Sequence, residues 1–336
     1  MSLGVDIIGF GPIGRELARK LVSDELNKSF NVASITDSSG AIYPKNAADV
    51  LKAVEWKEGK PSQKLSASGI EKHGGKSSDS QIVVDVTTSD YNKADEAKRR
   101  ATDSLESGKH FVSANKVALA YYFSDVFDLA KKKNLIVGYG ATICGGIHAI
   151  SVARKIRSGE IISASAVLNA STTMILSMLE DDPMLSFDEA CKKAAETGVL
   201  EKDWGVDLDG LDAGAKTAIL ANVLFPDSKL SLGDIAIRGI RDDNAQLLIR
   251  YVALKRGEAD EKIRLVSEIS NDGALVEPKA VKKESPLAVA GRFNAVLLET
   301  KTLGEISVRN LGGGVALTAS VIIADLKNIA NLQKKS

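Results

Sequence analysis

A short strand, a glycine-rich turn and a helix follow one another at the start of this chain. Val5–Ile8 is apolar, and the turn GFGPIG occupies Gly9–Gly14. Leu17, Ala18 and Leu21 then recur at the spacing of one helix face. In a GxGxxG turn, the first glycine permits a tight bend, the second lets a ligand approach the backbone, and the third lets helix and strand pack closely. A chain that begins this way is expected to form a dinucleotide-binding βαβ unit.

The turn by itself is a weak indicator, because a glycine-rich turn without a ligand has the same sequence. Its context is stronger: the turn follows a strand, opens a helix and precedes a second expected strand that ends at Asp37. The amino terminus of the helix also offers backbone N–H groups to an anion. We therefore predict a nicotinamide dinucleotide here, bound by Gly9, Phe10, Gly11, Ile13 and Gly14.

Asp37 bears on which nicotinamide cofactor is bound. A carboxylate at the end of the second strand accepts hydrogen bonds from the adenosine ribose and favours NAD. The two serines that follow it would accommodate a 2′-phosphate if a lysine approached, and Lys45, Lys57 and Lys60 are the candidates. An ordinary turn residue is a third interpretation of Asp37. The sequence leaves the choice between NAD and NADP open.

Strands and helices continue to alternate after the first unit. Strands are expected at residues 30–37, 81–87, 110–116 and 134–142, with helices between them. Residues 81–87 form a near-continuous β-branched run, which is typical of a buried parallel strand. This order predicts an α/β fold with a Rossmann-type doubly wound parallel sheet. The polar, glycine- and serine-rich residues 55–80 are expected to form a surface excursion.

Polar side chains follow two of these strands. Thr87 and Thr88 end one strand, and Ser113, Asn115 and Lys116 end the next. Ligands of open α/β sheets bind at that edge. We therefore expect the Thr87 and Ser113 hydroxyls to bind the nicotinamide ribose and carboxamide, with Lys116 close to the hydride transfer. Strand-end caps and a solvated lysine are the alternatives.

From Ser151 the order of elements changes. A strand leads into an apolar helix, Ser186 and Glu189 make a capping box for another helix, and Pro226 ends a third. Two strands, a triple-glycine turn and a final helix are expected at the end of the chain. The prediction is a second, α+β domain over residues 141–307, with residues 1–140 plus 308–336 forming the Rossmann domain.

Composition excludes several classes of protein. Lysine plus arginine and aspartate plus glutamate both total 44, so no basic surface for nucleic acid is expected. The two cysteines, Cys144 and Cys191, fall outside any CxxC pattern and predict neither a disulfide framework nor a thiolate zinc site. No signal-like amino terminus and no apolar run of bilayer length are present. We expect a cytoplasmic protein without a membrane partner.

An acidic stretch, EKDWGVDLDGLDAGAK, runs from Glu201 to Lys216. Asp212 and Lys216 are four residues apart and share one face of a helix. A surface ion pair that stabilises the helix by a few tenths of a kcal/mol is the ordinary interpretation. Asp209, which precedes a glycine, is expected to be a solvated turn residue, and Trp204 a packing residue.

Six motifs together resemble the homoserine dehydrogenase family over essentially the whole chain. They are GFGPIG, SANK, GYGATICGGI, LNASTTMIL, the long segment FDEACKKAAETGVLEKDWGVDLDGLDAGAK and NLGGGVALTA. The resemblance is to a short form without a regulatory domain or a fused kinase. It implies NAD(P)-dependent interconversion of L-homoserine and L-aspartate 4-semialdehyde by a homodimer whose second domain supplies the substrate site and the dimer interface. An aspartate dehydrogenase-like oxidoreductase and a non-catalytic NAD(P)-binding regulator are the alternatives.

The resemblance also implies roles for individual residues. Glu201, Asp207 and Asp212 match the carboxylates that bind the substrate ammonium group. Lys216 matches the lysine that exchanges the alcohol proton, so Lys216, Lys116 and Asp212 are the expected catalytic residues. Gly312 matches the C-terminal glycine turn that returns to the nicotinamide, and the small hydroxyl residues of LNASTTM match a turn that contacts the substrate carboxylate.

The sequence departs from the family at Gly140. Relatives commonly have a glutamate there, which binds a monovalent cation together with nearby carbonyl groups. Carbonyl groups of Ile143 and Gly145 with water would suit a hard cation. Because the carboxylate is missing, we predict no metal-ligating side chains.

Overall fold

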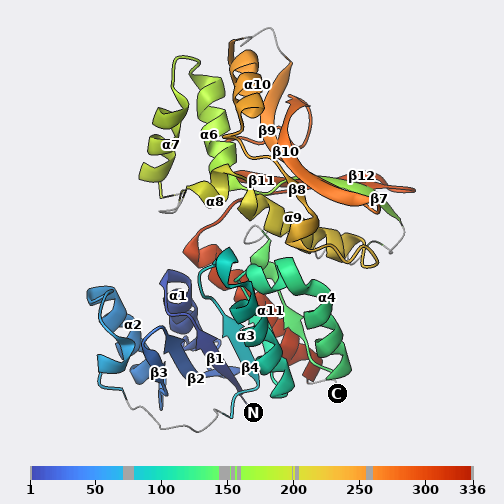
Figure 1. Ribbon diagram of the computed structural model, residues 1–336. Coiled ribbons are helices and arrows are strands. Elements are labelled where there is room, and N and C mark those ends of the chain that lie inside the picture. Colours follow the sequence, from blue (N-terminus) through green and yellow to red (C-terminus); the bar gives the residue numbers. More distant parts are fainter. Residues whose placement is uncertain are drawn as a thin grey trace. The chain divides into compact units, whose positions relative to one another are not determined.

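The structure is a computed structural model that describes residues 2–70, 79–143, 152, 156, 160–198, 200, 204–254 and 260–333. The chain divides into two compact units (Figure 1). Unit 1 comprises Met1–Thr142 and Gly314–Ser336, and unit 2 comprises Ile143–Gly313. Residues 308–313, predicted to join the first domain, belong to unit 2, because strand β12 (Gly304–Leu311) continues into them. Residues 141–142 belong instead to unit 1.

A six-stranded sheet forms the centre of unit 1. Its strands are β1 (Leu3–Ile8), β2 (Phe30–Asp37), β3 (Gly40–Ile42), β4 (Ile82–Asp85), β5 (His110–Ser113) and β6 (Val137–Gly138). Their order is β3-β2-β1-β4-β5-β6, and every pairing is parallel except that of β2 with β3. The predicted Rossmann-type parallel sheet is confirmed. The chain order reverses at β1, between β2 and β4, and ligands of such sheets bind at that point.

Helices cover the sheet of unit 1 (Figure 1). They are α1 (Pro12–Leu21), α2 (Ala47–Gly59), α3 (Ala94–Glu106), α4 (Val117–Lys132) and α11 (Val315–Gln333), with 3₁₀ turns η1 (Leu65–Ala67), η2 (Tyr91–Lys93) and η3 (Gly140–Thr142). Leu17 of α1 packs in one buried cluster with Val5 and Ile7 of β1 and Leu326 of α11. This cluster fixes the amino terminus of α1 against the end of β1.

Helix α11 is 19 residues long and, in the part of the chain described, is the helix whose length and composition would suit a membrane span. Its apolar residues have another partner, however. Ala319, Ile322, Ile323, Leu326 and Ile329 are buried in the core cluster of unit 1. α11 is a core helix of the Rossmann unit.

Unit 2 contains a second six-stranded sheet. Its strands are β7 (Ile161–Val167), β8 (Ala236–Ile237), β9 (Glu261–Ser270), β10 (Gly273–Lys282), β11 (Phe293–Thr300) and β12. Its helices are α6 (Ala170–Asp181), α7 (Phe187–Glu196), α8 (Gly205–Leu208), α9 (Leu211–Leu224) and α10 (Asp243–Leu254), with the 3₁₀ turn η4 (Leu232–Asp234). The sheet is antiparallel apart from the β8–β10 pair, and α6 and α9 share a buried cluster with β9. The predicted second α+β fold is confirmed.

A buried ion pair ties α6 to β9. The Arg264 side chain is 0% exposed, and its Nη1 donates to Glu180 Oε1 at 2.6 Å. Arg264 also donates to the backbone carbonyl groups of Val289 and Ile263. The Ile263 N–H donates to the same Glu180 oxygen at 2.9 Å. A buried guanidinium group with this many acceptors holds α6 in a fixed position on the sheet.

Replacing Glu180 with alanine is expected to lower the free energy of unfolding by about 3–5 kcal/mol, because the Arg264 charge would stay buried without its partner. Glu277→Ala is the control, since its ion pair with Arg238 is at the surface and such pairs contribute about 0–1 kcal/mol. Urea unfolding followed by circular dichroism measures both. Equal losses in the two variants would contradict the role of the buried pair.

Candidate active site

The three glycines of the turn between β1 and α1 differ in the space that a side chain would have. Gly9 has φ +99°, and a Cβ there would lie 2.7 Å from the Thr87 nitrogen. A Cβ on Gly14 would lie 2.1 Å from the Gly9 oxygen. A Cβ on Gly11 would meet no atom within 4 Å. Packing therefore requires Gly9 and Gly14, whereas Gly11 leaves its backbone open, as a bound pyrophosphate needs.

Phe10 and Ile13 of the turn face inwards, whereas Pro12 is exposed. Phe10 is 3% exposed and belongs to the core of unit 1, and Ile13 packs against that core. The Phe10 carbonyl accepts a hydrogen bond from Arg15 Nη1 at 3.3 Å. Because its side chain is in the core, the predicted contact of Phe10 with a cofactor would be made by its backbone.

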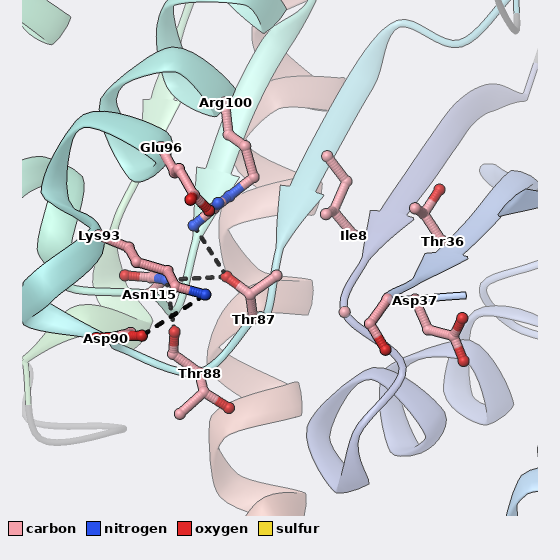
Figure 2. A pocket seen from close by; sticks show the side chains of 12 residues that line it. Ile8, Thr36, Asp37, Thr87, Thr88, Asp90, Lys93, Glu96, Arg100 and Asn115 are labelled. Carbon is pink, nitrogen blue, oxygen red and sulfur yellow. Dashed lines mark hydrogen bonds and ion pairs between the residues drawn. The ribbon is translucent and has the colours of Figure 1, made fainter. Parts of the chain in front are cut away.

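A cleft of about 450 Å³ lies at the switch point of the sheet (Figure 2). It is lined by Ile8, Gly9, Thr36, Asp37, Ser38, Thr87, Thr88, Asp90, Lys93, Glu96, Arg100 and Asn115. Figure 2 shows Thr87, Asn115 and Arg100 converging on one side of the cleft, with Thr36 and Asp37 on the other. The turn residue Gly9, Asp37 and Thr87, all predicted from the sequence, line this one cleft.

Asp37 is held as an anion at the end of β2. Ser39 donates to Asp37 Oδ1 from its backbone nitrogen at 2.8 Å and from Oγ at 2.5 Å, and Lys57 Nζ lies 3.1 Å from Oδ2. Burial opposes ionisation of Asp37, but the hydrogen bonds from Ser39 and the charge of Lys57 outweigh it and hold its pKa below the ordinary value. Of the three candidate lysines, the ion pair with Asp37 belongs to Lys57, while the Lys60 ammonium lies over the Trp56 ring.

The Thr87 hydroxyl is fully used by its neighbours. It donates to Asp85 Oδ1 at 2.6 Å and accepts from Arg100 Nη2 at 3.2 Å and Asn115 Nδ2 at 2.9 Å. A hydroxyl has one donor and two acceptor positions, so all three are occupied. Arg100 Nε also donates to Asp85, which is 0% exposed, at 2.9 Å. Thr87 organises this side of the cleft, and its predicted bond to the nicotinamide ribose would need one of these contacts to be exchanged.

The SANK segment at the end of β5 is also internally bonded. Ser113 is 0% exposed and donates from Oγ to the Asn115 carbonyl at 2.8 Å, which is the strand-end role given above as the alternative. Asn115 Oδ1 accepts from the Val117 nitrogen at 2.8 Å. Lys116 stands at the N-cap position of α4, and its backbone nitrogen donates to Ser89 Oγ at 3.2 Å. These bonds fix the loop from which the Lys116 side chain extends.

Gly140, where the family pattern has a glutamate, lies in a tight site in unit 1. Its nitrogen donates to Asp325 Oδ2 at 2.9 Å, and a Cβ there would lie 2.9 Å from Val321 Cγ1. α11 supplies both of these neighbours. Residues 144–151, which include Gly145, lie outside the described residues. Within the described ranges, no group of three or more His, Cys, Asp or Glu side chains could hold a metal ion.

Asp212 and Lys216 form a buried pair in unit 2. Lys216 Nζ donates to Asp212 Oδ2 at 2.6 Å and to the Leu168 carbonyl at 2.8 Å. The two side chains are only 13% and 12% exposed. The surface ion pair considered as the ordinary interpretation is therefore wrong. Both side chains come from the first turns of α9, and Leu168, whose carbonyl accepts from Lys216, directly follows β7.

Asp207 joins this pair through Asn169. Asn169 Nδ2 donates to Asp207 Oδ1 at 2.6 Å and to Asp212 Oδ2 at 2.9 Å. Burial, and next the charge of Asp212, raise the pKa of Asp207 to about 6. Asn169, Lys216 and Ser171 act in the opposite direction. The predicted residues Asp207, Asp212 and Lys216 are thus brought together in one cluster.

Asn169 is the member of this cluster that the sequence analysis did not select. It stands in the motif LNASTTM, directly after β7, where the hydroxyl residues drew attention. Its signal in the sequence is the N-cap position of α6, which an asparagine fills well. Its contacts with α8 and α9 span 38 and 43 residues of sequence, a separation that no local pattern reports.

Other predicted residues lie apart from this cluster. Asp209 is exposed and paired with Arg241, as expected of a solvated acid, and Trp204 packs against the core of unit 2. Gly312 is fixed by packing within unit 2, because a Cβ there would lie 2.4 Å from Asn294 Nδ2. Glu201 lies outside the described residues.

Comparison with known proteins gives one family for both units. A family model for homoserine dehydrogenase matches residues 149–326, and one for its NAD binding domain matches residues 9–139. The chain is 36% identical to the homoserine dehydrogenase of Methanocaldococcus jannaschii, covering 99% of this chain and 100% of the relative. It is 32% identical to that of Pyrococcus horikoshii, with 97% of each chain covered. A solved hyperthermophilic archaeal homoserine dehydrogenase in complex with NADPH is similar with a TM-score of 0.82 and 32% identity, covering 99% of this chain and 98% of that one.

Proposed function

Since the chain belongs to the homoserine dehydrogenase family, we propose that the buried cluster of Asn169, Asp207, Asp212 and Lys216 is its substrate site. The enzyme interconverts L-homoserine and L-aspartate 4-semialdehyde with NAD(P). The reaction that the resemblance implied is confirmed, and it replaces the aspartate dehydrogenase-like and non-catalytic alternatives. The observation that carries the proposed site is the Lys216–Asp212 pair, with side chains 13% and 12% exposed, beside the partly buried carboxylate of Asp207.

The residues of unit 1 suit a nicotinamide dinucleotide. Gly11 leaves open space over the turn, and the amino terminus of α1 offers its N–H groups to a pyrophosphate. A nicotinamide dinucleotide held there would supply the hydride chemistry of the reaction. We propose that Asp37 binds the adenosine ribose and that Lys116, after β5, lies near the hydride transfer.

Lys216 is proposed to move the alcohol proton. In the direction of reduction, its Nζ would donate a proton to the oxygen that becomes the homoserine hydroxyl, and in the direction of oxidation it would take that proton back. Asp212 and the Leu168 carbonyl aim the ammonium group by accepting two of its three hydrogens.

Asp207 and Asp212 are proposed to bind the substrate ammonium group. Two carboxylates in one buried site repel each other, and a cation between or beside them relieves that repulsion. Glu201 is the third carboxylate of this proposal.

A spectrophotometric assay of reduced nicotinamide with purified protein, homoserine and each cofactor tests the proposed function. Absence of turnover with both NAD and NADP, across several pH values and with added Na⁺ or K⁺, would contradict it.

The balance between NAD and NADP is proposed to depend on Asp37 and Lys57. The ionised Asp37 favours a ribose hydroxyl over a phosphate, and Lys57 partly neutralises it. Asp37→Ser is expected to raise the KM for NAD and lower the KM for NADP, each by roughly tenfold, because a charge-assisted hydrogen bond is lost and the Lys57 ammonium faces the 2′ position alone.

Steady-state kinetics with both cofactors measure this change. Lys57→Met is the matched control, since it removes the cation and should weaken NADP relative to NAD. The assignment of Asp37 would be wrong if Asp37→Ser changed both KM values in the same direction.

A homodimer is proposed through the sheet of unit 2. Phe293 and Leu311 are opposite each other on β11 and β12 and are 40% and 54% exposed. Leu303, in the turn between these strands, and Ile162 of β7 are also exposed. Exposed apolar groups on neighbouring strands are typical of an interaction surface. Light scattering that gives about twice the chain mass of 35.6 kDa would support the dimer, and the mass of one chain would exclude it.

A further inference from the structure

The side chain of Asn169 makes hydrogen bonds to Asp207 and Asp212 in addition to the one that caps helix α6. Its Oδ1 accepts from the Thr172 backbone nitrogen at 2.8 Å, which makes it the N-cap of α6. A backbone N–H bonds only to an acceptor, so this contact fixes the amide with its nitrogen on the other side. That nitrogen donates one hydrogen to Asp207 and one to Asp212. Both hydrogens and one lone pair of the amide are therefore used.

The charges around Asn169 explain what this arrangement accomplishes. Among the described residues, the charged groups that act on Asp207 are Asp212 and Lys216 of α9. The neutral groups that act on it are Asn169, the N-cap of α6, and Ser171 in the first turn of that helix. Asp212 shares its Oδ2 between Lys216 and Asn169. Without a donor between them, the two carboxylates would repel each other, and one of them would take up a proton or turn away.

We propose that Asn169 is a positioning residue that holds Asp207 and Asp212 side by side as anions and so sets the position of the Lys216 ammonium group. The inference rests on the proposed function of this cluster. It adds the N-cap residue of α6, whose amide acts through the two acids. Because the same side chain caps α6, the start of that helix and the acid pair keep one fixed geometry.

Substitution by serine separates the two tasks of Asn169. A serine or aspartate caps a helix about as well as asparagine, so Asn169→Ser and Asn169→Asp both keep the acceptor for Thr172. Serine loses the two N–H donors, and aspartate adds a third negative charge. Ser186→Ala, which removes the N-cap of α7, is the control for the loss of a helix cap in the same unit.

In Asn169→Ser, kcat/KM for homoserine is expected to fall by about 10- to 100-fold, as for the loss of hydrogen bonds to charged groups. The acid limb of its pH profile is expected to move to higher pH, because the acid pair binds protons more readily without the donor. Asn169→Asp should lose more activity than Asn169→Ser. Ser186→Ala should keep the wild-type pH profile. An unchanged acid limb in Asn169→Ser would overturn the proposal.

Carbon-13 NMR titration of the aspartate carboxyl groups in the cofactor-free enzyme gives a second measurement. The midpoint for Asp207 should be near 6 in the wild type and higher by about one pH unit in Asn169→Ser. An equal midpoint in both proteins would also overturn the proposal. This titration does not depend on turnover, so it decides the role of Asn169 even if the wild-type enzyme failed to oxidise homoserine, which would contradict the proposed function alone.

Discussion

Lys216→Ala is expected to lower kcat for homoserine oxidation by about 10²–10⁴-fold, the range that a positioned proton-transfer group contributes. The reason is the position of Nζ, 2.6 Å from Asp212 Oδ2 and 2.8 Å from the Leu168 carbonyl, in a site where the side chain is 13% exposed. Alanine leaves no group there that exchanges a proton. Lys216→Arg is expected to fail as well, because a guanidinium group does not give up its proton at working pH.

Cofactor binding separates this effect from a loss of folding. All the residues that line the described cofactor cleft belong to unit 1, whereas Lys216 belongs to unit 2. Fluorescence titration with reduced nicotinamide should therefore give the same affinity in Lys216→Ala and the wild type. Lys192→Ala, at an exposed position of α7, is the control and should keep full activity. If Lys216→Ala retained most of the wild-type kcat, the proton would have to come from another group.

Gly11→Ala is expected to lose affinity for the cofactor, whereas Gly14→Ala is expected to lose stability. A Cβ on Gly11 meets no atom of the protein within 4 Å, and its φ of −72° suits any residue. We expect Gly11→Ala to fold with an unchanged or slightly higher melting temperature, since alanine restricts the unfolded chain. Its affinity for cofactor should fall by at least about tenfold, or 1.4 kcal/mol, because the methyl group takes the space of the pyrophosphate.

Gly14→Ala places a methyl group 2.1 Å from the Gly9 carbonyl, a contact that backbone must move to relieve. Overpacking of this kind destabilises proteins by about 1–3 kcal/mol or more. Calorimetry should show a lower melting temperature for Gly14→Ala and not for Gly11→Ala. The turn would not be the pyrophosphate site if Gly11→Ala bound NAD and NADP as tightly as the wild type.

The sequence predicts the framework of both sites because that framework is local. The order of strand, GxGxxG turn and helix lies within the first 21 residues, and the strand ends that carry Asp37 and Thr87 follow from apolar runs. The i, i+4 spacing of Asp212 and Lys216 likewise places both on one helix face. Whether that face is buried depends on β7 and α6, and spacing cannot report it.

The partners of the predicted side chains are what the sequence leaves out. The sequence gives no reason to prefer Lys45, Lys57 or Lys60 as the partner of Asp37. In the structure, helix α2 places Lys57 beside Asp37. Asn169 is missed because its acids come from α8 and α9, and Ser113 is turned inwards by the Asn115 carbonyl. Each of these outcomes is set by hydrogen-bond geometry in three dimensions.

The saturated hydroxyl of Thr87 has a consequence for the energetics of cofactor binding. Its three bonds to Asp85, Arg100 and Asn115 exist in the protein alone, so these side chains have already given up their rotamer freedom. A dinucleotide that enters the cleft does not have to order them. This side of the cleft is therefore preorganised. Arg100→Met should weaken cofactor binding chiefly by making the entropy of binding less favourable. Calorimetric titration measures that entropy.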